Sequence, residues 1–432
     1  MLLYERYREC NWSVTTDSRS IAGGELFFAL KGENFDGNEY AMRALEAGAS
    51  FAVVNEDADL PDDPRLIRVP DPFTALRELA TYHREHVREG RLPVIGLTGT
   101  NGKTTTKELI NAVLSEKYRV TATQGNLNND IGVPLSLLKI RPDTEIAVIE
   151  MGASHPDDIA KLVKVCRPDY GLITNVGKAH LLGFGSFDGV KAAKGELYRW
   201  LGDREGSVIF LNEDDADLRE MAAKEPCHCF GYGVEYQNAE VLPSSPEEPF
   251  LRIRLDGRTI RTKLVGAYNA TNVLAALCIG RYFGVDREKA EAAIEAYTPS
   301  NNRSQMTRTE NNTLIIDAYN ANPSSMAAAL ENFRNVQANR KVALLGDMRE
   351  LGEDSLKEHI GIVEKVSGME IEACLVGEEF SKALQAGGWN EIKWFPTSEE
   401  LCSYLEENPL KNAVILVKGS RGIRMEKVLP VL

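Results

Sequence analysis

The sequence predicts an α/β protein of three domains, at residues 1–90, 91–298 and 299–432. Strand-like and helix-like runs alternate from residue 93 to 298, which implies a mainly parallel sheet covered by helices. The alternation restarts near residue 299 and predicts a second, Rossmann-like open sheet. A charged segment with Gly and Pro, residues 88–93, separates the first domain from the rest. The 432 residues suit two or three domains, each with its own core.

The composition narrows the class of protein. Hydrophobic residues make up 43% and charged residues 26%, which is ordinary for a globular chain. The net charge of −14 argues against nucleic acid as the main partner, because phosphate neutralisation needs a basic surface. The seven cysteines are scattered, and we expect free thiols in a reducing compartment. Without a signal-peptide shape or a membrane-length apolar run, the sequence predicts a cytoplasmic protein, and we expect a monomer.

The elements follow from short apolar runs bounded by turn residues. The first domain is expected to contain strands at Glu25–Leu30 and Phe51–Asn55, and helices at Glu39–Ala47 and from Phe73 to about Glu89. The second is expected to have strands at 94–98, 119–123, 145–150, 170–176 and 207–211. An Asp256-Gly257 pair between alternating residues predicts added antiparallel strands, and a helix at Ala270–Phe283 closes this domain. Strands of the third are expected at 313–318, 341–346, 373–376, 392–395 and 413–417.

A phosphate-binding loop is the most specific motif. It lies between a strand-like run at 94–97 and a helix-like run at 107–114, and it contains Gly99, Thr100, Asn101, Gly102, Lys103, Thr104 and Thr105. Glycines allow a sharp turn, so that backbone amides face a phosphate at the helix N-terminus. Lys103 offers a positive charge and Thr104 a hydroxyl for magnesium. The common template has glycine where this chain has Leu97, and the alternative is a Gly/Thr-rich turn that binds nothing. The order of strand, loop and helix favours a nucleoside triphosphate site.

Three further candidates lie near the carboxyl ends of strands or on a helix. Glu150 ends a buried-type strand and is a candidate magnesium ligand, although a solvent-facing glutamate is the plain alternative. His180 follows the next strand, where a lone histidine is more often structural. Composition alone favours a solvated helix lysine at Lys194. Polar residues later in the chain are weaker candidates: Asn269 or Asn272 as a helix cap, Arg303 as a phosphate contact and Asp317 as a ribose contact.

Several segments, taken in order, resemble the Mur ligase family of ATP-dependent amide-bond synthetases. Their sequences are Thr-Asp-Ser-Arg at 16–19, Leu-Phe-Phe-Ala-Leu-Lys-Gly at 26–32, Phe-Asp-Gly at 35–37, Gly-Asn-Leu-Asn-Asn-Asp-Ile-Gly-Val-Pro at 125–134, Asp-Ala-Tyr-Asn-Ala-Asn-Pro at 317–323, Leu-Gly-Asp-Met-Arg-Glu-Leu-Gly at 345–352 and Val-Lys-Gly-Ser-Arg at 417–421. The resemblance covers essentially the whole chain and is specific in combination. It implies a small UDP-binding domain, a central ATPase-like domain with a phosphate loop and a Rossmann-like last domain.

The resemblance also implies roles for single residues. Glu150 and His180 match positions that help to hold Mg²⁺, and Lys194 matches a lysine that family members carry as a carbamate. Asn272 matches an adenine contact, Arg303 a γ-phosphate contact and Asp317 a ribose contact. Lys103, Lys194, His180 and Arg303 are thereby the expected catalytic group. The expected substrate-binding residues are Ser18, Arg19, Phe35, Asp36, Asn126, Asn128 and Asn129.

Within the family, the segments at 125–134 and 317–323 are most similar to the branch that joins D-alanyl-D-alanine to UDP-N-acetylmuramoyl-tripeptide. That branch uses ATP and Mg²⁺ and proceeds through an acyl phosphate. The absence of an Asp-Asn-Pro-Arg segment, which is typical of the relative that adds the third amino acid, supports the same choice. The third residue of the peptide, diaminopimelate or lysine, stays open.

Three alternatives remain at this stage. Another amide ligase of the superfamily, such as a different muramoyl-peptide ligase or folylpolyglutamate synthase, is the nearest. The segments at 17–19 and 35–37 argue against folylpolyglutamate synthase, which lacks this first domain. A nucleotide-switch protein would turn over ATP slowly and ignore any dipeptide, and a structural scaffold would need no phosphate loop.

Overall fold

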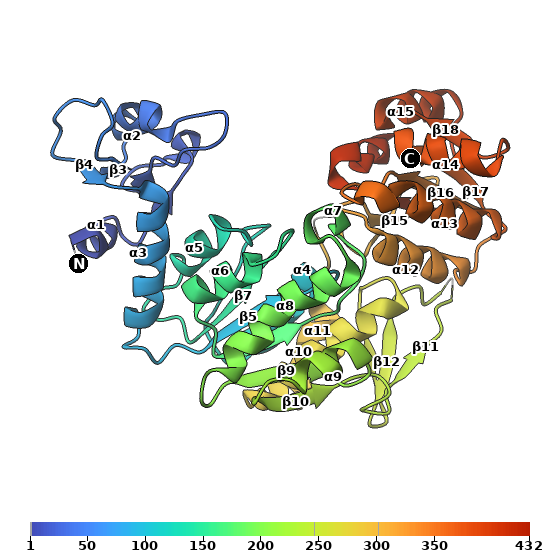
Figure 1. The fold of residues 1–432 in the computed structure, drawn as a ribbon. Helices are drawn as coiled ribbons and strands as arrows, with labels where there is room; N and C mark the ends of the chain where they lie inside the picture. The colour runs from blue at the N-terminus through green and yellow to red at the C-terminus, as the bar shows by residue number, and fades with distance from the viewer. Residues whose placement is uncertain (1, 246, 301) are drawn as a thin grey trace.

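The structure is a computed structural model that describes residues 2–245, 247–300 and 302–432. Three units are visible in Figure 1. The first, in blue, and the last, in orange and red, stand on opposite sides of the central green and yellow unit. The predicted α/β class is confirmed. Within the described ranges, no helix combines the length and the apolar character needed to cross a membrane.

The first unit has a four-stranded parallel sheet in the order β1-β2-β3-β4. Its strands are β1 (Val14–Thr15), β2 (Leu26–Phe28), β3 (Phe51–Asn55) and β4 (Leu66–Val69). Its helices are α1 (Leu2–Glu9), α2 (Ala41–Glu46) and α3 (Pro72–His86). The start of α3 follows from local chemistry, because Asp71 accepts hydrogen bonds from the Phe73 and Thr74 amides and Pro72 occupies the first turn.

The central unit has a six-stranded parallel sheet in the order β10-β9-β8-β5-β7-β6. Its strands are β5 (Val94–Thr98), β6 (Val120–Ala122), β7 (Ile146–Glu150), β8 (Tyr170–Ile173), β9 (Val208–Asn212) and β10 (His228–Tyr232). Alternate side chains enter different cores, as a pleated strand requires. Ala147 and Ile149 of β7 join one core, whereas Ile146 and Val148 join the other. Both faces are therefore covered, which explains the continuous apolar runs.

Helices cover this sheet and connect its strands. They are α4 (Lys103–Ser115), α5 (Gly132–Leu137), α6 (Asp158–Cys166), α7 (Leu181–Phe184), α8 (Phe187–Gly202), α9 (Ala216–Ala222), α10 (Ala270–Tyr282) and α11 (Arg287–Ala296). The predicted hairpin at Asp256-Gly257 is present between β12 and β13. Its strands form a separate three-stranded antiparallel sheet, made of β11 (Glu240–Leu242), β12 (Arg252–Leu255) and β13 (Arg258–Arg261).

The last unit has a six-stranded sheet in the order β14-β15-β19-β16-β17-β18. Its strands are β14 (Gln305–Arg308), β15 (Thr313–Asp317), β16 (Lys341–Gly346), β17 (Glu372–Val376), β18 (Lys393–Phe395) and β19 (Val414–Lys418). All neighbours are parallel except β14, which pairs antiparallel with β15 at the edge. Its helices are α12 (Pro323–Arg334), α13 (Ser355–Ser367), α14 (Glu378–Gly387) and α15 (Ser398–Glu407).

Helix α3 fastens the first unit to the central one. Leu76 and Leu79 of α3 lie in the same apolar core as Val133 of α5 and Leu162 of α6. At the same junction, His83 Nε2 donates to the Ile140 carbonyl at 2.9 Å, and Tyr4 Oη lies 3.2 Å from His83 Nδ1. One apolar core therefore contains residues from both sides of the predicted domain boundary near residue 90. The domain boundaries themselves stay a prediction.

The buried His83 predicts a pH dependence of stability. Burial is the main cause that lowers its pKa to about 4, from 6.5 in an unfolded chain. Between these two values the unfolded chain binds a proton that the folded chain does not, so stability falls as the pH falls from 6.5 to 4. One such group contributes at most about 1.4 kcal/mol per pH unit.

We expect His83→Gln, which keeps a donor for the Ile140 carbonyl, to be less sensitive to acid than the unmodified protein. Urea unfolding between pH 7 and 4 measures both proteins. The two free energies of unfolding should converge on acidification, and parallel curves would refute the assignment.

Candidate active site

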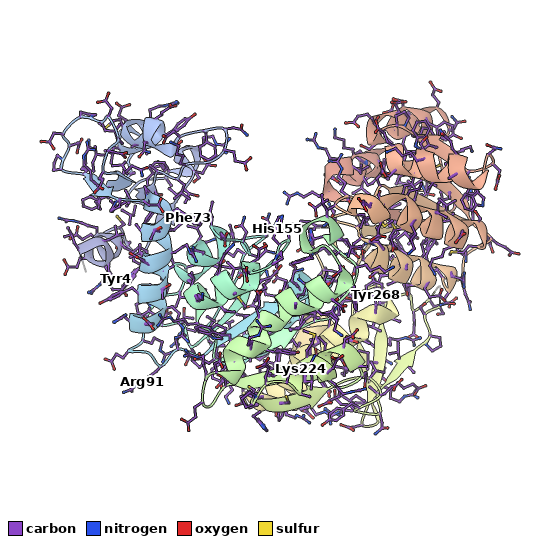
Figure 2. The ribbon with its side chains drawn as sticks, in the orientation of Figure 1. Tyr4, Phe73, Arg91, His155, Lys224 and Tyr268 are labelled. Atoms are coloured by element: carbon purple, nitrogen blue, oxygen red, sulfur yellow. The ribbon has the colours of Figure 1, made fainter. Side chains whose placement is uncertain are left out.

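A cavity of about 810 Å³ lies at the carboxyl ends of the central strands and is lined by residues of all three units. Figure 2 labels three of its lining residues. Phe73 belongs to α3, His155 follows β7, and Tyr268 precedes α10. Ligand sites of parallel sheets lie at this edge, so the cavity is the candidate active site.

The predicted phosphate loop has the backbone of a binding loop. Gly99 and Gly102 have φ angles of 144° and 79°, which favour glycine. A side chain at Gly99 would also place Cβ 1.9 Å from Thr174 Oγ1. The neighbouring loop holds the turn in place, because Thr174 Oγ1 donates to the Asn101 carbonyl at 2.6 Å and Asn175 Oδ1 accepts from the Asn101 amide at 3.0 Å.

Lys103 opens helix α4 and is folded back onto the loop. Its Nζ donates to the carbonyls of Gly99 and Thr100, at 2.7 and 3.1 Å. Burial is the main cause that lowers the pKa of its ammonium group, and the nearby Arg303 lowers it further. Glu150 acts in the opposite direction. Two cationic side chains thus approach the same cavity, which favours an anionic ligand.

Glu150 is a buried carboxylate with partners from two other segments. It is 1% exposed, and it accepts from Thr104 Oγ1 at 3.0 Å and from Asn128 Nδ2 at 2.8 Å. Carboxylate and hydroxyl oxygens suit magnesium, which commonly completes its shell with water and phosphate oxygens. Among the described residues there is no group of three His, Cys, Asp or Glu side chains that could hold a metal ion.

His180 lies at the rim shared with the last unit. It has a left-handed backbone, with φ of 51°, and its Nδ1 pairs with the Glu350 carboxylate. Burial is the largest influence and lowers its pKa, with contributions from Lys103 and Lys194, whereas Glu350 raises it. The imidazole lines the cavity, but it faces a carboxylate of the last unit.

Lys194 is not a solvated helix lysine. It is 2% exposed, and its Nζ lies 5.5 Å from the centre of the Phe184 ring. Burial, followed by the charge of Lys103, lowers its pKa to about 7. Lys191, one helical turn earlier, has 18% of its side chain exposed and pairs with Asp217 at 2.7 Å. A large fraction of the Lys194 amine is therefore neutral near pH 7.

The remaining candidates come from α10 and the last unit. Asn272 accepts from Thr106 Oγ1 at 3.0 Å and donates to Asn269 Oδ1 at 2.9 Å, so it packs behind the phosphate loop. Of the two asparagines expected as helix caps, Asn269 occupies the cap position without a side-chain cap hydrogen bond, and Asn272 lies inside the first turn of the helix that begins at Ala270. Asp317 accepts from the buried Lys418 at 2.6 Å, at the cavity wall.

The cavity brings together most of the predicted residues, namely Thr100, Asn101, Gly102, Lys103, Thr105, Asn126, Asn128, Asn129, Glu150, His180, Asn272, Arg303 and Asp317. Gly99, Thr104 and Lys194 lie behind its wall, in contact with or close to lining residues. The first-unit candidates are elsewhere. Asp36 lines a separate cavity of about 390 Å³, Phe35 is 57% exposed, and Arg19, next to Ser18, pairs with Asp17.

Sequence reasoning missed several lining residues. Asn322 caps α12 and also donates to Asn101 Oδ1 at 2.8 Å, so the last unit contacts the phosphate loop. Its position before Pro323 was a readable helix-start signal. Lys418, in the family-like segment 417–421, lines the cavity, and so do Asp158 and Tyr319.

Comparison of the chain with known protein families identifies its family. Three family models match in succession: "Mur ligase family, catalytic domain" at residues 13–88, "Mur ligase middle domain" at 97–280 and "Mur ligase, glutamate ligase domain" at 302–421. The chain belongs to the Mur ligase family. The resemblance inferred from the sequence is confirmed.

Three relatives of known identity are similar to the chain over nearly its whole length. The UDP-N-acetylmuramoyl-tripeptide–D-alanyl-D-alanine ligase of Bacillus subtilis is 34% identical, with 96% of this chain and 92% of the relative covered. The crystal structure of MurF from Acinetobacter baumannii has a TM-score of 0.83 at 31% identity, covering 97% and 92%. MurF from Thermotoga maritima, in complex with ADP, has a TM-score of 0.82 at 27% identity, covering 97% and 96%.

The turn at Gly99 gives a test of the phosphate loop. Gly99→Ala places a methyl group against Thr174 and strains a backbone at φ 144°, so the loop amides should lose their alignment. We expect the affinity for ADP to fall about tenfold or more, since charge-assisted hydrogen bonds contribute about 1.5–3 kcal/mol each.

Gly206→Ala is the matched control, because Gly206 has φ of 79° but open space around it. It should cost about 1–2 kcal/mol of stability and leave ADP affinity unchanged. Calorimetric titration measures both variants. Equal ADP affinity in the two would contradict the proposed loop geometry.

Proposed function

We propose that this chain is an ATP-dependent ligase that joins D-alanyl-D-alanine to UDP-N-acetylmuramoyl-tripeptide in cytoplasmic peptidoglycan precursor synthesis. The observation that supports this proposal most directly is a single cavity lined by the phosphate loop, the buried carboxylate of Glu150 and the cationic Arg303 of the last unit. The names of the Bacillus subtilis and Acinetobacter baumannii relatives support this choice of substrates. As part of the proposal, the enzyme works as a monomer.

ATP binds between the central and last units in this proposal. The amides of Gly99–Thr105 hold the phosphates, Asn272 contacts the adenine, and Asp317 holds a ribose hydroxyl. Thr104, Glu150, His180 and Lys194 as a carbamate would hold Mg²⁺, directly or through water. Magnesium supplies charge neutralisation on the phosphates when it is bound. The oxygen-rich setting of Glu150 fits this ion.

The chemistry is two successive displacements. A carboxylate oxygen of the tripeptide attacks the γ-phosphorus, the bond to the ADP oxygen breaks, and an acyl phosphate forms. Lys103 and Arg303 offset the charge on the transferred group. The neutral amine of D-alanyl-D-alanine then attacks the acyl carbon, loses a proton and expels phosphate. Alignment of the reactants is the main contribution of the protein, worth about 7–11 kcal/mol in model reactions.

The UDP-N-acetylmuramoyl-tripeptide is proposed to extend from the cavity to the first unit. Asn126, Asn128 and Asn129 line the cavity and are proposed to contact the peptide. Ser18, Arg19, Phe35 and Asp36 are proposed to hold the UDP end. Phe73 of α3 lines the cavity too, so first-unit residues reach the same space.

Lys194 is proposed to carry a carbamate. Its neutral amine attacks carbon dioxide, an N–C bond forms, and the amine proton leaves, so that a cation becomes an anion. A pKa of about 7 makes the neutral amine available, and the charge of Lys103 nearby favours the anionic product.

Lys103→Ala tests the function. Phosphate release is measured with ATP and the muramoyl-tripeptide, with and without D-alanyl-D-alanine. The unmodified protein should release phosphate rapidly only when the dipeptide is present. Lys103→Ala should lower this rate about 10²–10³-fold, because a charge contact in the transition state is lost.

Lys224→Ala is the control, since Lys224 is an exposed lysine that pairs with Glu220, away from the cavity. It should retain the full rate. Dipeptide-independent turnover in the unmodified protein would favour the nucleotide-switch alternative, and a fast Lys103→Ala would refute the phosphate-loop role.

Lys194→Ala tests the carbamate. The variant should be nearly inactive, and acetate should partly restore its activity by occupying the vacated oxygen positions. Lys191→Ala, on the same helix but paired with surface acids, should be unaffected. With ¹³C-bicarbonate, carbon NMR should show a carbamate signal that is absent from Lys194→Ala. Retention of the signal in that variant would overturn the assignment.

A further inference from the structure

Tyr319 lies between two arginines at the wall of the cavity. The guanidinium carbon of Arg303 is 3.6 Å from the centre of the Tyr319 ring. That of Arg421 is 5.4 Å from the same ring centre, and Arg421 Nη1 donates to the Tyr319 hydroxyl at 3.3 Å. Arg303 and Tyr319 both line the cavity, whereas Arg421 is among the exposed residues.

The topology of the last unit brings this pair together. Strand β14 begins two residues after Arg303, and β15 ends two residues before Tyr319. The two strands are antiparallel, with Gln305 opposite Ile316, so the start of one strand adjoins the end of the other. Tyr319 is therefore placed beside Arg303 by strand pairing and not by a flexible connection.

The aromatic ring is the close partner that fixes Arg303. Across the described ranges of the chain, Arg303 makes no ion pair and no hydrogen bond, and its Nε is buried without a partner. An arginine side chain has many rotamers, so a free guanidinium would sample many positions. Contact with an aromatic face offsets part of the entropy that is lost when the side chain is held in one position, and it leaves the N–H donors unused.

We propose that Tyr319 is a positioning residue, whose ring holds the guanidinium of Arg303 ready for the terminal phosphate of ATP. This inference rests on the proposed function, which assigns Arg303 to that phosphate. A plain packing role for Tyr319, or a direct contact with the base or ribose, would affect ADP and ATP alike. A positioning role acts on the terminal phosphate alone, and that difference can be measured.

The test compares affinities for ADP and for an ATP analogue with a methylene group between the β- and γ-phosphates, by calorimetric titration of the full chain with Mg²⁺. The measured quantity is the ratio of the two affinities. Tyr319→Leu should lower the preference for the analogue about 2- to 10-fold, with ADP affinity unchanged. Tyr319→Phe is the matched control, because it keeps the ring and removes only the hydroxyl that contacts Arg421.

A double-mutant cycle with Arg303→Ala distinguishes a failure of the role proposed for Tyr319 from a failure of the role proposed for Arg303. If Tyr319 acts through Arg303, Tyr319→Leu should have no further effect on the ratio in the Arg303→Ala background. Equal losses for ADP and the analogue, or an effect that persists without Arg303, would overturn the positioning role. If Arg303→Ala itself leaves the ratio unchanged, the proposed function of Arg303 fails instead. Tyr319→Met replaces Tyr319→Leu if the latter does not fold, as judged by circular dichroism.

Discussion

One buried carboxylate organises the site. Glu150 is 1% exposed at the end of β7, and an ion in such a place costs several kcal/mol unless hydrogen bonds compensate it. Thr104 supplies one bond from α4, and Asn128 supplies another from the loop before α5. The phosphate-loop helix and the asparagine loop are thus tied to the same charged group.

The buried Lys107 also helps to hold Glu150 in place, through Thr123. Lys107 is fully buried, and its Nζ donates to the Thr123 carbonyl at 2.5 Å. Thr123 Oγ1 in turn accepts from the Glu150 amide at 3.0 Å. The backbone of Glu150 is therefore held as well as its side chain. The loop residues Thr123 and Asn128 and the helix residue Thr104 thus hold Glu150 together before any ligand binds, as a preorganised site requires.

The sequence predicted the two large sheets because their strands are buried on both faces and read as short apolar runs. Predicted strands at 94–98 and 341–346 agree with β5 and β16 at both ends. The missed elements lack this signal. Strand β14, with the sequence Gln-Met-Thr-Arg, is a strand because it pairs with β15, and α5 is six residues long and contains Pro134. Pairing and packing of this kind are properties of the folded chain.

The site was predictable where one short segment carries the chemistry, as in the phosphate loop. It was not predictable where the role of a residue depends on its burial or on contacts with residues far away in the sequence. Lys191 and Lys194 lie one turn apart on α8, yet one pairs with surface acids and the other is 2% exposed. No local pattern separates them, and the family resemblance alone singled out Lys194. Likewise, Asn322 meets Asn101 across 221 positions of the chain.

The two outer units differ in how they contact the central unit near the cavity. The first shares an apolar core with the central unit through Leu76 and Leu79, and separating it would expose those side chains at about 1.5–3 kcal/mol each. The last unit takes Val265 of the central unit into its own apolar core, and it meets the phosphate loop and the loop after β8 through polar pairs, Asn101 with Asn322 and Lys178 with Glu358. Water can replace such bonds at a net cost of about 0.5–1.5 kcal/mol each. Parting the last unit, which carries Arg303, from the phosphate loop therefore costs less for each polar pair than exposing one of the leucines that join the first unit to the central one.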